Sequence, residues 1–363
     1  MGRVSFWVVE TDPVVTGVAR ERQNRKIAQS RRGRGGTQSF LLACTLVFAA
    51  CSSKTTASEQ PQSTATVAAA PANLEFPAPE KFGGFDARRA YAHVQTTVGY
   101  GPRPVGSEAW RKSQEYIKAQ LAGANCAVEE DDFEAATPLG RMKMKNIVGK
   151  AAGEKPEVIL FLTHYETKNM PELPTFVGAN DPGSSVAVVL ELARLLCAPD
   201  RKRSVTYWFG FVDGEEAFGE WSDTNSTFGS RQMAAKLSLS GELKKIKAVV
   251  LFDMVGGDNF GIRRESNSTT WLTDILWSTA KRLGYGQHFL DSSSPTEDDH
   301  IPFLRRNVPA VDIIEAPGDY EHWHTAQDTL DKISPRSLAM VGHVVLESLP
   351  DIEKRKQAPA TKP

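Results

Sequence analysis

Four short apolar runs dominate the pattern of hydrophobic and polar positions in this chain. They cover residues 158–162, 205–212, 248–252 and 308–314. Runs of this length, rich in valine, isoleucine and phenylalanine, are typical of strands that are buried on both faces. Residues 182–196, between the first two runs, repeat apolar positions at helical spacing. Strands that alternate with helices predict an α/β fold with three layers, a central, mostly parallel mixed β-sheet flanked by helices.

Composition separates the middle of the chain from its two ends. With 363 residues, of which 40% are hydrophobic and 24% charged, the chain can bury a full-sized core. No linker interrupts the middle, so we expect one domain over residues 79–352. Residues 52–78, rich in Ser, Thr, Ala, Pro and Gln, predict an unstructured tether, and residues 353–363 a polar tail. The net charge of −1 gives no electrostatic argument for binding nucleic acid.

The first 51 residues have the features of a signal region. Basic residues (Arg31, Arg32, Arg34) precede an apolar stretch that is too short to span a bilayer and ends in small residues before Cys51. This arrangement resembles a bacterial lipoprotein signal, in which the cysteine carries lipid and becomes the mature N-terminus. We therefore expect a lipid-anchored protein on the periplasmic side of a bacterial cell envelope. Ordinary signal cleavage or a short membrane anchor is the alternative.

Two cysteines, Cys126 and Cys197, lie inside the predicted domain. An oxidising envelope compartment permits a disulfide between them. Two independent buried thiols satisfy the sequence equally well, so the pairing stays open at this point.

The adjacent carboxylates Glu215 and Glu216 follow the second apolar run. Neighbouring buried acids repel each other unless a cation or a proton relieves the repulsion. Ligands of open α/β sheets bind at the carboxyl ends of the strands, which is where this pair falls. The pattern predicts that one carboxylate holds a metal and the other moves protons. Two solvated acids on a loop are the alternative.

Further polar residues follow the other apolar runs or begin a helix. They are His164, Asp181, Asp253, Asp298, Asp299 and His324. Taken singly, each can serve as a helix cap, a turn residue or a satisfied strand-end side chain. Taken together at one sheet edge, two carboxylates and a histidine with an open fourth position describe a catalytic zinc site.

Longer motifs resemble a known family. Asp213-Gly-Glu-Glu-Ala-Phe, the block EDDHIPFLRRNVP at residues 297–309 and Trp323-His324-Thr325 are similar to animal-type glutaminyl cyclases, also called glutaminyl-peptide cyclotransferases. These enzymes share the zinc-exopeptidase fold with bacterial leucine aminopeptidases. The resemblance extends from about Ala90 to Leu349. The chain departs from the family at Glu166, where aspartate is usual, at Thr163, where animal enzymes have a disulfide cysteine, and at Glu220, where histidine is common.

The resemblance implies a role for each candidate residue. The zinc ligands are expected to be Asp181, Glu216 and His324, around one Zn²⁺. Glu215 is expected to be the proton-transferring acid/base, with Asp253 and Asp298 completing its hydrogen-bond network. Substrate-pocket walls are expected from Trp221 and Trp323, with Tyr320 as a substitute pocket aromatic.

The implied reaction is cyclisation of an N-terminal glutamine to pyroglutamate with release of ammonia, on peptide or protein N-termini. The main alternative is an aminopeptidase with two zinc ions, in which His164 and Asp253 help to hold the second ion. A third hypothesis is a non-catalytic envelope lipoprotein that uses the same fold to bind a partner. The sequence predicts no nucleic-acid partner, and membrane contact only through the lipid.

Overall fold

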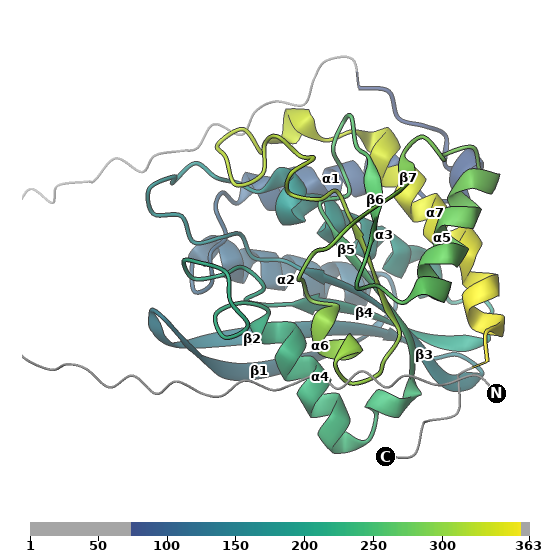
Figure 1. Cartoon of the computed structure of the whole chain (residues 1–363), viewed down its shortest axis with the longest axis horizontal. Helices are drawn as coiled ribbons and strands as arrows, with labels where there is room; N and C mark the ends of the chain where they lie inside the picture. The colour runs from purple at the N-terminus through teal and green to yellow at the C-terminus, as the bar shows by residue number, and fades with distance from the viewer. Residues whose placement is uncertain (1–73, 357–363) are drawn as a thin grey trace, which may run out of the picture. The chain divides into compact units, whose positions relative to one another are not determined.

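The structure, a computed structural model, describes residues 74–356 (Figure 1). The predicted signal region, Cys51 and most of the tether lie outside the described residues. The strands are β1 (Ala127–Thr137), β2 (Gly140–Ala151), β3 (Lys155–His164), β4 (Val205–Val212), β5 (Ile246–Asp253), β6 (Ile262–Glu265), β7 (Phe289–Ser294) and β8 (Ala310–Ile314).

Helices alternate with these strands along most of the domain. The α-helices are α1 (Ala87–Gly99), α2 (Glu108–Gly123), α3 (Ser185–Leu196), α4 (Phe228–Ser240), α5 (Thr270–Arg282), α6 (Ile301–Leu304) and α7 (Pro335–Lys354). Shorter helical turns are η1 (Pro79–Phe82), η2 (Ala179–Ser184), η3 (Leu243–Lys245) and η4 (Leu330–Lys332).

Six strands form the main sheet, in the order β1-β2-β4-β3-β5-β8. The pairs among β4, β3, β5 and β8 are parallel, whereas β2 runs antiparallel to both β4 and β1. Strands β6 and β7 form a separate parallel pair. The predicted mostly parallel mixed sheet is therefore confirmed, with the antiparallel pairs confined to one side.

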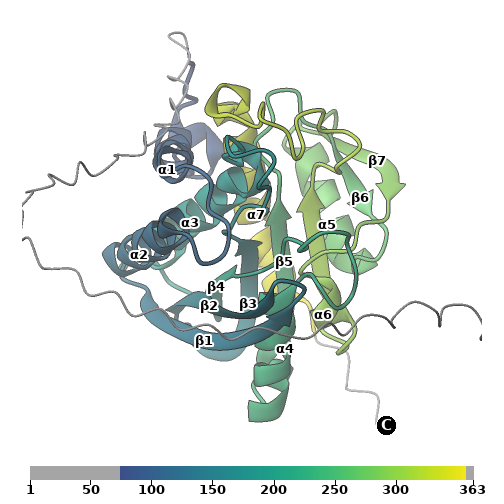
Figure 2. The same cartoon turned by 90° about the vertical axis from the view of Figure 1, so that its left-hand side faces the viewer.

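Alternate residues of the buried strands feed two cores. Along β3, Ile159 and Phe161 pack into the core shared with α1, α2, α3, α5 and α7. Leu160 and Leu162 point to the other face, where residues of α4 and α6 pack. Figure 2 shows α1, α2 and α3 on one side of the sheet and α4 and α6 on the other. Because both faces are covered, the strands read as continuous apolar runs rather than alternating ones.

Local sequence signals set where several helices begin. Asp86 accepts hydrogen bonds from the first backbone N–H groups of α1, and Ser107 does the same for α2. Ser334 caps α7, and Pro335 occupies its first position, where no intrahelical N–H is needed. Helix α7 ends at Lys354, two residues beyond the expected boundary. Glu353 accepts hydrogen bonds from hydroxyl groups at the start of β4, which holds this last turn in the domain.

The two remaining cysteines are paired. Cys126, just before β1, and Cys197, just after α3, form a disulfide that spans 71 residues of sequence. The structure thus decides between the two states that the sequence left open. Within residues 74–356 no helix has both the length and the apolar character needed to cross a membrane.

Candidate active site

The parallel strands β3, β4 and β5 end at the same edge of the sheet, and the predicted site residues meet there. His164 and Asp253 are the last residues of β3 and β5, and Glu216 lies in the turn after β4. Asp181 arrives from η2 and His324 from the segment between β8 and η4. Residues up to 160 positions apart in sequence therefore line one small volume, as the sequence predicted.

Three side chains point their donor atoms at a common point. Nε2 of His324 lies 3.2 Å from Oδ2 of Asp181 and 3.1 Å from Oε1 of Glu216. Ligands around a tetrahedral ion with bonds of about 2.0–2.2 Å lie about 3.3–3.6 Å apart. The two spacings are slightly shorter than this range, and the mixed nitrogen and oxygen donors suit a zinc ion.

A second group of donors lies beside the first. Nε2 of His164 is 3.3 Å from Oδ1 of Asp181 and 3.4 Å from Oδ1 of Asp253. Asp181 belongs to both groups: its Oδ1 lies near His164 and its Oδ2 lies near His324. This arrangement can hold a second ion, or it can hold His164 as an imidazolium between carboxylates.

The electrostatics of the first group favour a positive charge. Burial by itself lowers the pKa of His324, but the neighbouring carboxylates of Asp181 and Glu216 raise it to about 10. Burial raises the pKa of Asp181, yet the hydrogen bonds from His164 and His324 leave it below its ordinary value. Buried acids that retain charge in this way require a cation in their midst.

Glu215 lies next to the three candidate ligands but outside their group. Its side chain is only 6% exposed, and its donor atom groups with those of His164 and Glu166. Burial, followed by the negative charges of Asp298 and Glu216, raises the pKa of Glu215 well above its ordinary value, against an opposing effect of His164. A raised pKa moves a carboxyl group toward the range in which a general acid/base works.

The Glu-Glu turn is held by buried hydrogen bonds. Oε1 of Glu166 accepts from the backbone N–H groups of both Glu215 and Glu216, at 2.6 and 3.2 Å. Asp213, at the base of the turn, accepts from Trp110 Nε1 at 3.0 Å. Gly214 has a φ of +69°, which a residue with a side chain rarely adopts. The longer glutamate at position 166 is thus part of what aims the acid pair.

Asp181 is positioned by a close backbone approach. A Cβ atom on Gly178 would lie 1.9 Å from the carbonyl oxygen of Asp181, so only glycine fits there. Arg103, which is buried, donates hydrogen bonds to the carbonyl groups of Val177 and Gly178. His324 itself has a φ of +51°, an uncommon conformation for a residue with a side chain.

The loop that carries Asp298 is also pinned from behind. Glu265 accepts hydrogen bonds from the backbone of Thr296 at 3.1 Å and from Nε2 of His300 at 3.1 Å. Burial, followed by the negative charges of Asp253 and Asp299, raises the pKa of Asp298 well above its ordinary value. One oxygen of Asp298 is buried without a hydrogen-bond partner in the described structure. A carboxyl group kept in this state can donate a hydrogen bond into the site.

A cavity of about 450 Å³ opens over these groups. Trp221 and Trp323 line it and are 40% and 39% exposed. The ring of Trp323 stacks on that of His324 at a centroid distance of 4.1 Å. Glu220 and Glu297 lie exposed at its mouth. The cavity can therefore admit a chain end between two aromatic side chains.

Comparison with known proteins identifies the family. The sequence model of Peptidase family M28 matches residues 146–349. A glutaminyl-peptide cyclotransferase of Drosophila melanogaster is 32% identical over 268 residues, which are 66% of this chain and 75% of the relative. The chain belongs to peptidase family M28, and within it to the glutaminyl-peptide cyclotransferases.

Solved structures of the family agree with the fold. The crystal structure of an Acidobacteriales bacterium glutaminyl cyclase has a TM-score of 0.70 and 38% identity, covering 79% of this chain and 99% of that one. A Zn-dependent exopeptidase from Parabacteroides distasonis has a TM-score of 0.65 and 26% identity, covering 75% and 99%. The M28 match and this neighbour imply a zinc cofactor for the family member described here.

One residue expected in the pocket of this family member lies elsewhere. Tyr320 is buried and is not among the residues that line the cavity. Its hydroxyl donates to Oδ1 of Asp328 at 2.8 Å, which draws the ring into the protein behind Met254 and Ile314. The prediction of Tyr320 as a pocket aromatic is therefore wrong.

Two residues near the site were missed by the sequence analysis. Asp328 accepts hydrogen bonds from the backbone N–H groups of Asn180 and Asp181, at 2.8 and 3.1 Å. Lys168 places Nζ 3.3 Å from Oε2 of Glu216, the oxygen that faces away from His324. Neither residue follows an apolar run or sits in a recognisable motif.

Proposed function

We propose that this chain cyclises the N-terminal glutamine of peptides or proteins to pyroglutamate and releases ammonia. The observation that carries the proposal is the separation of roles at the sheet edge. Asp181, Glu216 and His324 aim at one point, while Glu215 stays buried beside them with a raised pKa. The named activity of the relatives supports the same reaction.

The reaction rearranges one residue and consumes no water. The substrate's α-amino nitrogen attacks its own γ-carboxamide carbon, forming the ring C–N bond, and the bond from that carbon to the amide nitrogen breaks. A proton leaves the attacking amine and ends on the departing ammonia. The site must therefore move one proton across a short distance and hold the side chain folded over the amine.

Asp181, Glu216 and His324 would hold one zinc ion. Bound zinc supplies Lewis-acid polarisation of the γ-carbonyl group. Glu215 accepts the proton from the amine and returns it to the leaving nitrogen, a task that requires its raised pKa. Asp253 and Asp298 support that exchange through their positions beside Glu215 and His164.

Proximity supplies a further part of the rate. The aromatic side chains of Trp221 and Trp323 line the cavity above the acids. A glutamine side chain bent between such walls has its amine and its carboxamide in contact before reaction, which removes part of the entropic cost. We expect both tryptophans to contribute to substrate binding.

Mass spectrometry tests the proposal directly. The zinc-loaded protein should convert a Gln-initiated peptide to a product lighter by one ammonia, and should leave a matched Leu-initiated peptide intact. An unchanged Gln-peptide in the presence of zinc-loaded, folded protein would exclude cyclase activity.

A second candidate function is hydrolysis of N-terminal residues with two zinc ions. The donor group of His164, Asp181 and Asp253 favours it, because these residues would hold a second ion beside the one that Asp181, Glu216 and His324 would hold. In that case Glu215 activates a water molecule, and the Leu-peptide gains the mass of water and loses its first residue. Inactivity on both peptides would instead favour the non-catalytic binding function.

We further propose that the protein is anchored in a bacterial envelope through lipid on Cys51. The basic and apolar segments before Cys51 support this, as does the Cys126–Cys197 disulfide, which suits an oxidising compartment. Metabolic labelling with a radioactive fatty acid should mark the wild-type protein, and Cys51→Ser should abolish the label. Equal labelling of the two proteins would contradict the proposal.

A further inference from the structure

A second large cavity lies at the opposite edge of the sheet from the acids. Its volume is about 610 Å³, larger than that of the cavity above Glu215. It is lined by the start of β5, the residues that lead into β8, the end of α4 and the end of α7. Strand β5 has eight residues, so at about 3.3 Å per residue the two cavities lie roughly 25 Å apart along the strand.

Basic side chains dominate this cavity. Of its 13 lining residues, none is acidic and five are lysine or arginine. The five are Lys244, Lys247, Arg306, Arg355 and Lys356. The whole chain has a net charge of −1, so this excess of positive charge is local. We call these five residues together with Trp271 the basic pocket.

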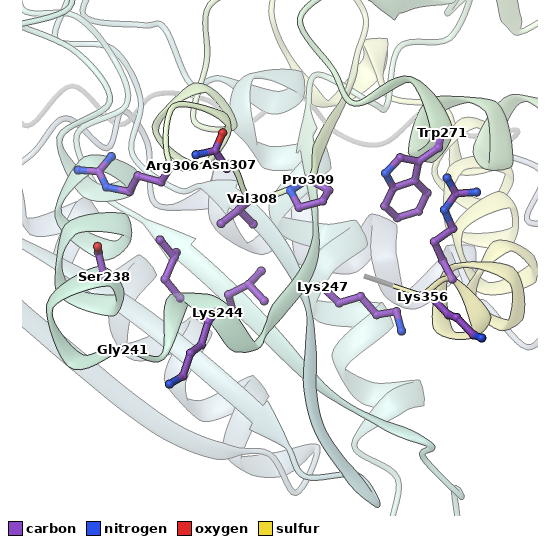
Figure 3. Close-up of a pocket in the computed structure, with 13 residues that line it drawn as sticks. Ser238, Gly241, Lys244, Lys247, Trp271, Arg306, Asn307, Val308, Pro309 and Lys356 are labelled. Carbon is purple, nitrogen blue, oxygen red and sulfur yellow. The ribbon is translucent and has the colours of Figure 1, made fainter. Parts of the chain in front are cut away.

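The basic side chains surround an apolar centre. Figure 3 shows Arg306 and Lys244 on one side, Lys247 and Lys356 on the other, and Val308 and Pro309 between them. Trp271 closes the far end, where the guanidinium of Arg355 lies 5.2 Å from its ring centroid. A ligand that fits both features has an anionic group and a flat or apolar portion.

Most of the positive charge is not neutralised within the protein. Lys247 donates to Oε1 of Glu157 at 3.2 Å and to the carbonyl of Glu353 at 2.8 Å, so it is already paired. Arg306 donates one N–H to the carbonyl of Pro302, a neutral acceptor. Within residues 74–356, Lys244 and Lys356 have no side-chain hydrogen bond or ion pair. These charges are available to a ligand.

We propose that the basic pocket binds a phosphate-bearing ligand with an apolar or aromatic portion. Guanidinium and ammonium groups are the usual partners of phosphate in proteins, and a cavity of about 300–1,000 Å³ suits a small organic molecule. The indole of Trp271 offers a surface for the apolar portion. A soluble phosphate ester and the headgroup of an anionic lipid share this chemistry. The site is separate from the acids around Glu215 and from the reaction proposed there.

Calorimetric titration of the full chain with phenyl phosphate and with inorganic phosphate tests the proposal. We expect saturable binding of both, with phenyl phosphate bound about five- to tenfold more tightly because its ring contacts Trp271. The substitution Trp271→Leu should remove that preference and leave inorganic phosphate binding in place. Equal affinity for the two probes in the wild-type protein would contradict the role of Trp271.

Charge removal tests the phosphate contacts. The triple variant K244Q/R306Q/K356Q removes three exposed charges and should weaken phenyl phosphate binding about tenfold or more. The matched control K143Q/K155Q/K202Q removes three exposed lysines elsewhere and should bind as the wild type does. Thermal unfolding of every variant verifies folding. Absence of saturable binding, or equal loss in both triple variants, would overturn the proposal.

Vesicles distinguish the two sources of phosphate. Phosphatidylcholine vesicles with or without phosphatidylglycerol are added to the phenyl phosphate titration. Competition by the anionic vesicles alone assigns the ligand to a lipid headgroup, whereas unchanged binding assigns it to a soluble ester. Both outcomes support the proposal that the basic pocket binds a phosphate group. The reason is that each is measured against the phenyl phosphate binding that the triple variant weakens.

Discussion

The two edges of the main sheet carry opposite charges in opposite surroundings. At the carboxyl edge, Asp181 and Glu216 are buried in one group of donor atoms with His324, and the buried Glu215 lies in a neighbouring group with His164. At the amino edge, Lys244 and Arg306 lie around an open cavity and are exposed to water. A cluster of like charges therefore has different consequences at the two edges.

Burial explains the difference. Like charges repel far more strongly in a protein interior than in water, so a buried group of acids is stable only with a cation or with bound protons. Exposed like charges are screened and cost little. The buried acids thus require a positive counter-charge, which zinc can supply. The exposed basic residues attract an anion but are stable without one. Changes to residues at the acidic edge should have the larger effects.

Removal of the metal should have the largest effect. Exhaustive chelation, or the substitution His324→Ala, should reduce cyclisation to below detection, because the group of acids loses its counter-charge and the carbonyl its polarising partner. Zinc content measured by atomic absorption should fall with activity. His164→Ala is the control: one zinc per chain retained by this variant supports the cyclase, and loss of one of two ions supports the aminopeptidase.

Loss of the proton carrier comes next. Glu215→Gln keeps the size of the side chain but cannot accept a proton, so kcat should fall about 10²–10⁴-fold. Zinc content should stay at the wild-type level, because Glu215 is not among the three proposed ligands. Stopped assays with a Gln-peptide give kcat and KM separately. Wild-type kcat in this variant would remove Glu215 from the mechanism.

Charges at the cavity mouth should have a smaller effect. Glu220 and Glu297 are exposed there, so a peptide with lysine after the glutamine should have a kcat/KM about two- to fivefold higher than one with glutamate. The double variant E220Q/E297Q should remove this preference, as should high salt. The control E154Q/D200N, which changes exposed acids at other places, should keep it. No preference in the wild-type protein would show that the mouth does not select by charge.

The smallest effect, on stability, is expected from single lysines at the amino edge. Lys247 is 4% exposed and paired, so Lys247→Met should lower the free energy of unfolding by about 1–3 kcal/mol. Lys244 is exposed without a side-chain partner in the described part of the chain. The substitution Lys244→Met should therefore change the free energy of unfolding by less than about 0.5 kcal/mol. Urea denaturation measures both. Equal effects would show that burial does not distinguish the two positions.

Much of the site followed from patterns that are local in sequence. The carboxyl ends of parallel strands share one edge, so apolar runs that end at His164, Glu215 and Asp253 predict that these residues meet. The structure brings them together. The Asp-Gly-Glu-Glu and Trp-His-Thr blocks indicated the family, and its match to residues 146–349 confirms it. Such patterns can be read from the sequence because strand periodicity and motif spacing depend only on residues that are close in sequence.

Long-range packing decided the rest. The side chain of Tyr320 turns into the protein because its hydroxyl bonds to Asp328. Cys126 forms a disulfide because the end of α3 brings Cys197 next to it. Glu166 gained its role when its carboxylate met the backbone of the Glu-Glu turn, 49 residues away. The basic pocket combines residues of η3, β5 and α5 with residues that follow α6 and α7, which the sequence analysis had no reason to bring together.

The sequence by itself therefore determined which polar residues follow which strand. It also determined, as a consequence, that acids and histidines lie at one edge of the sheet. Only the tertiary structure decided which of those side chains share a point, which turn away, and what forms at the opposite edge. The physical reason is that backbone periodicity acts over a few residues, whereas burial and charge pairing depend on every element that packs nearby.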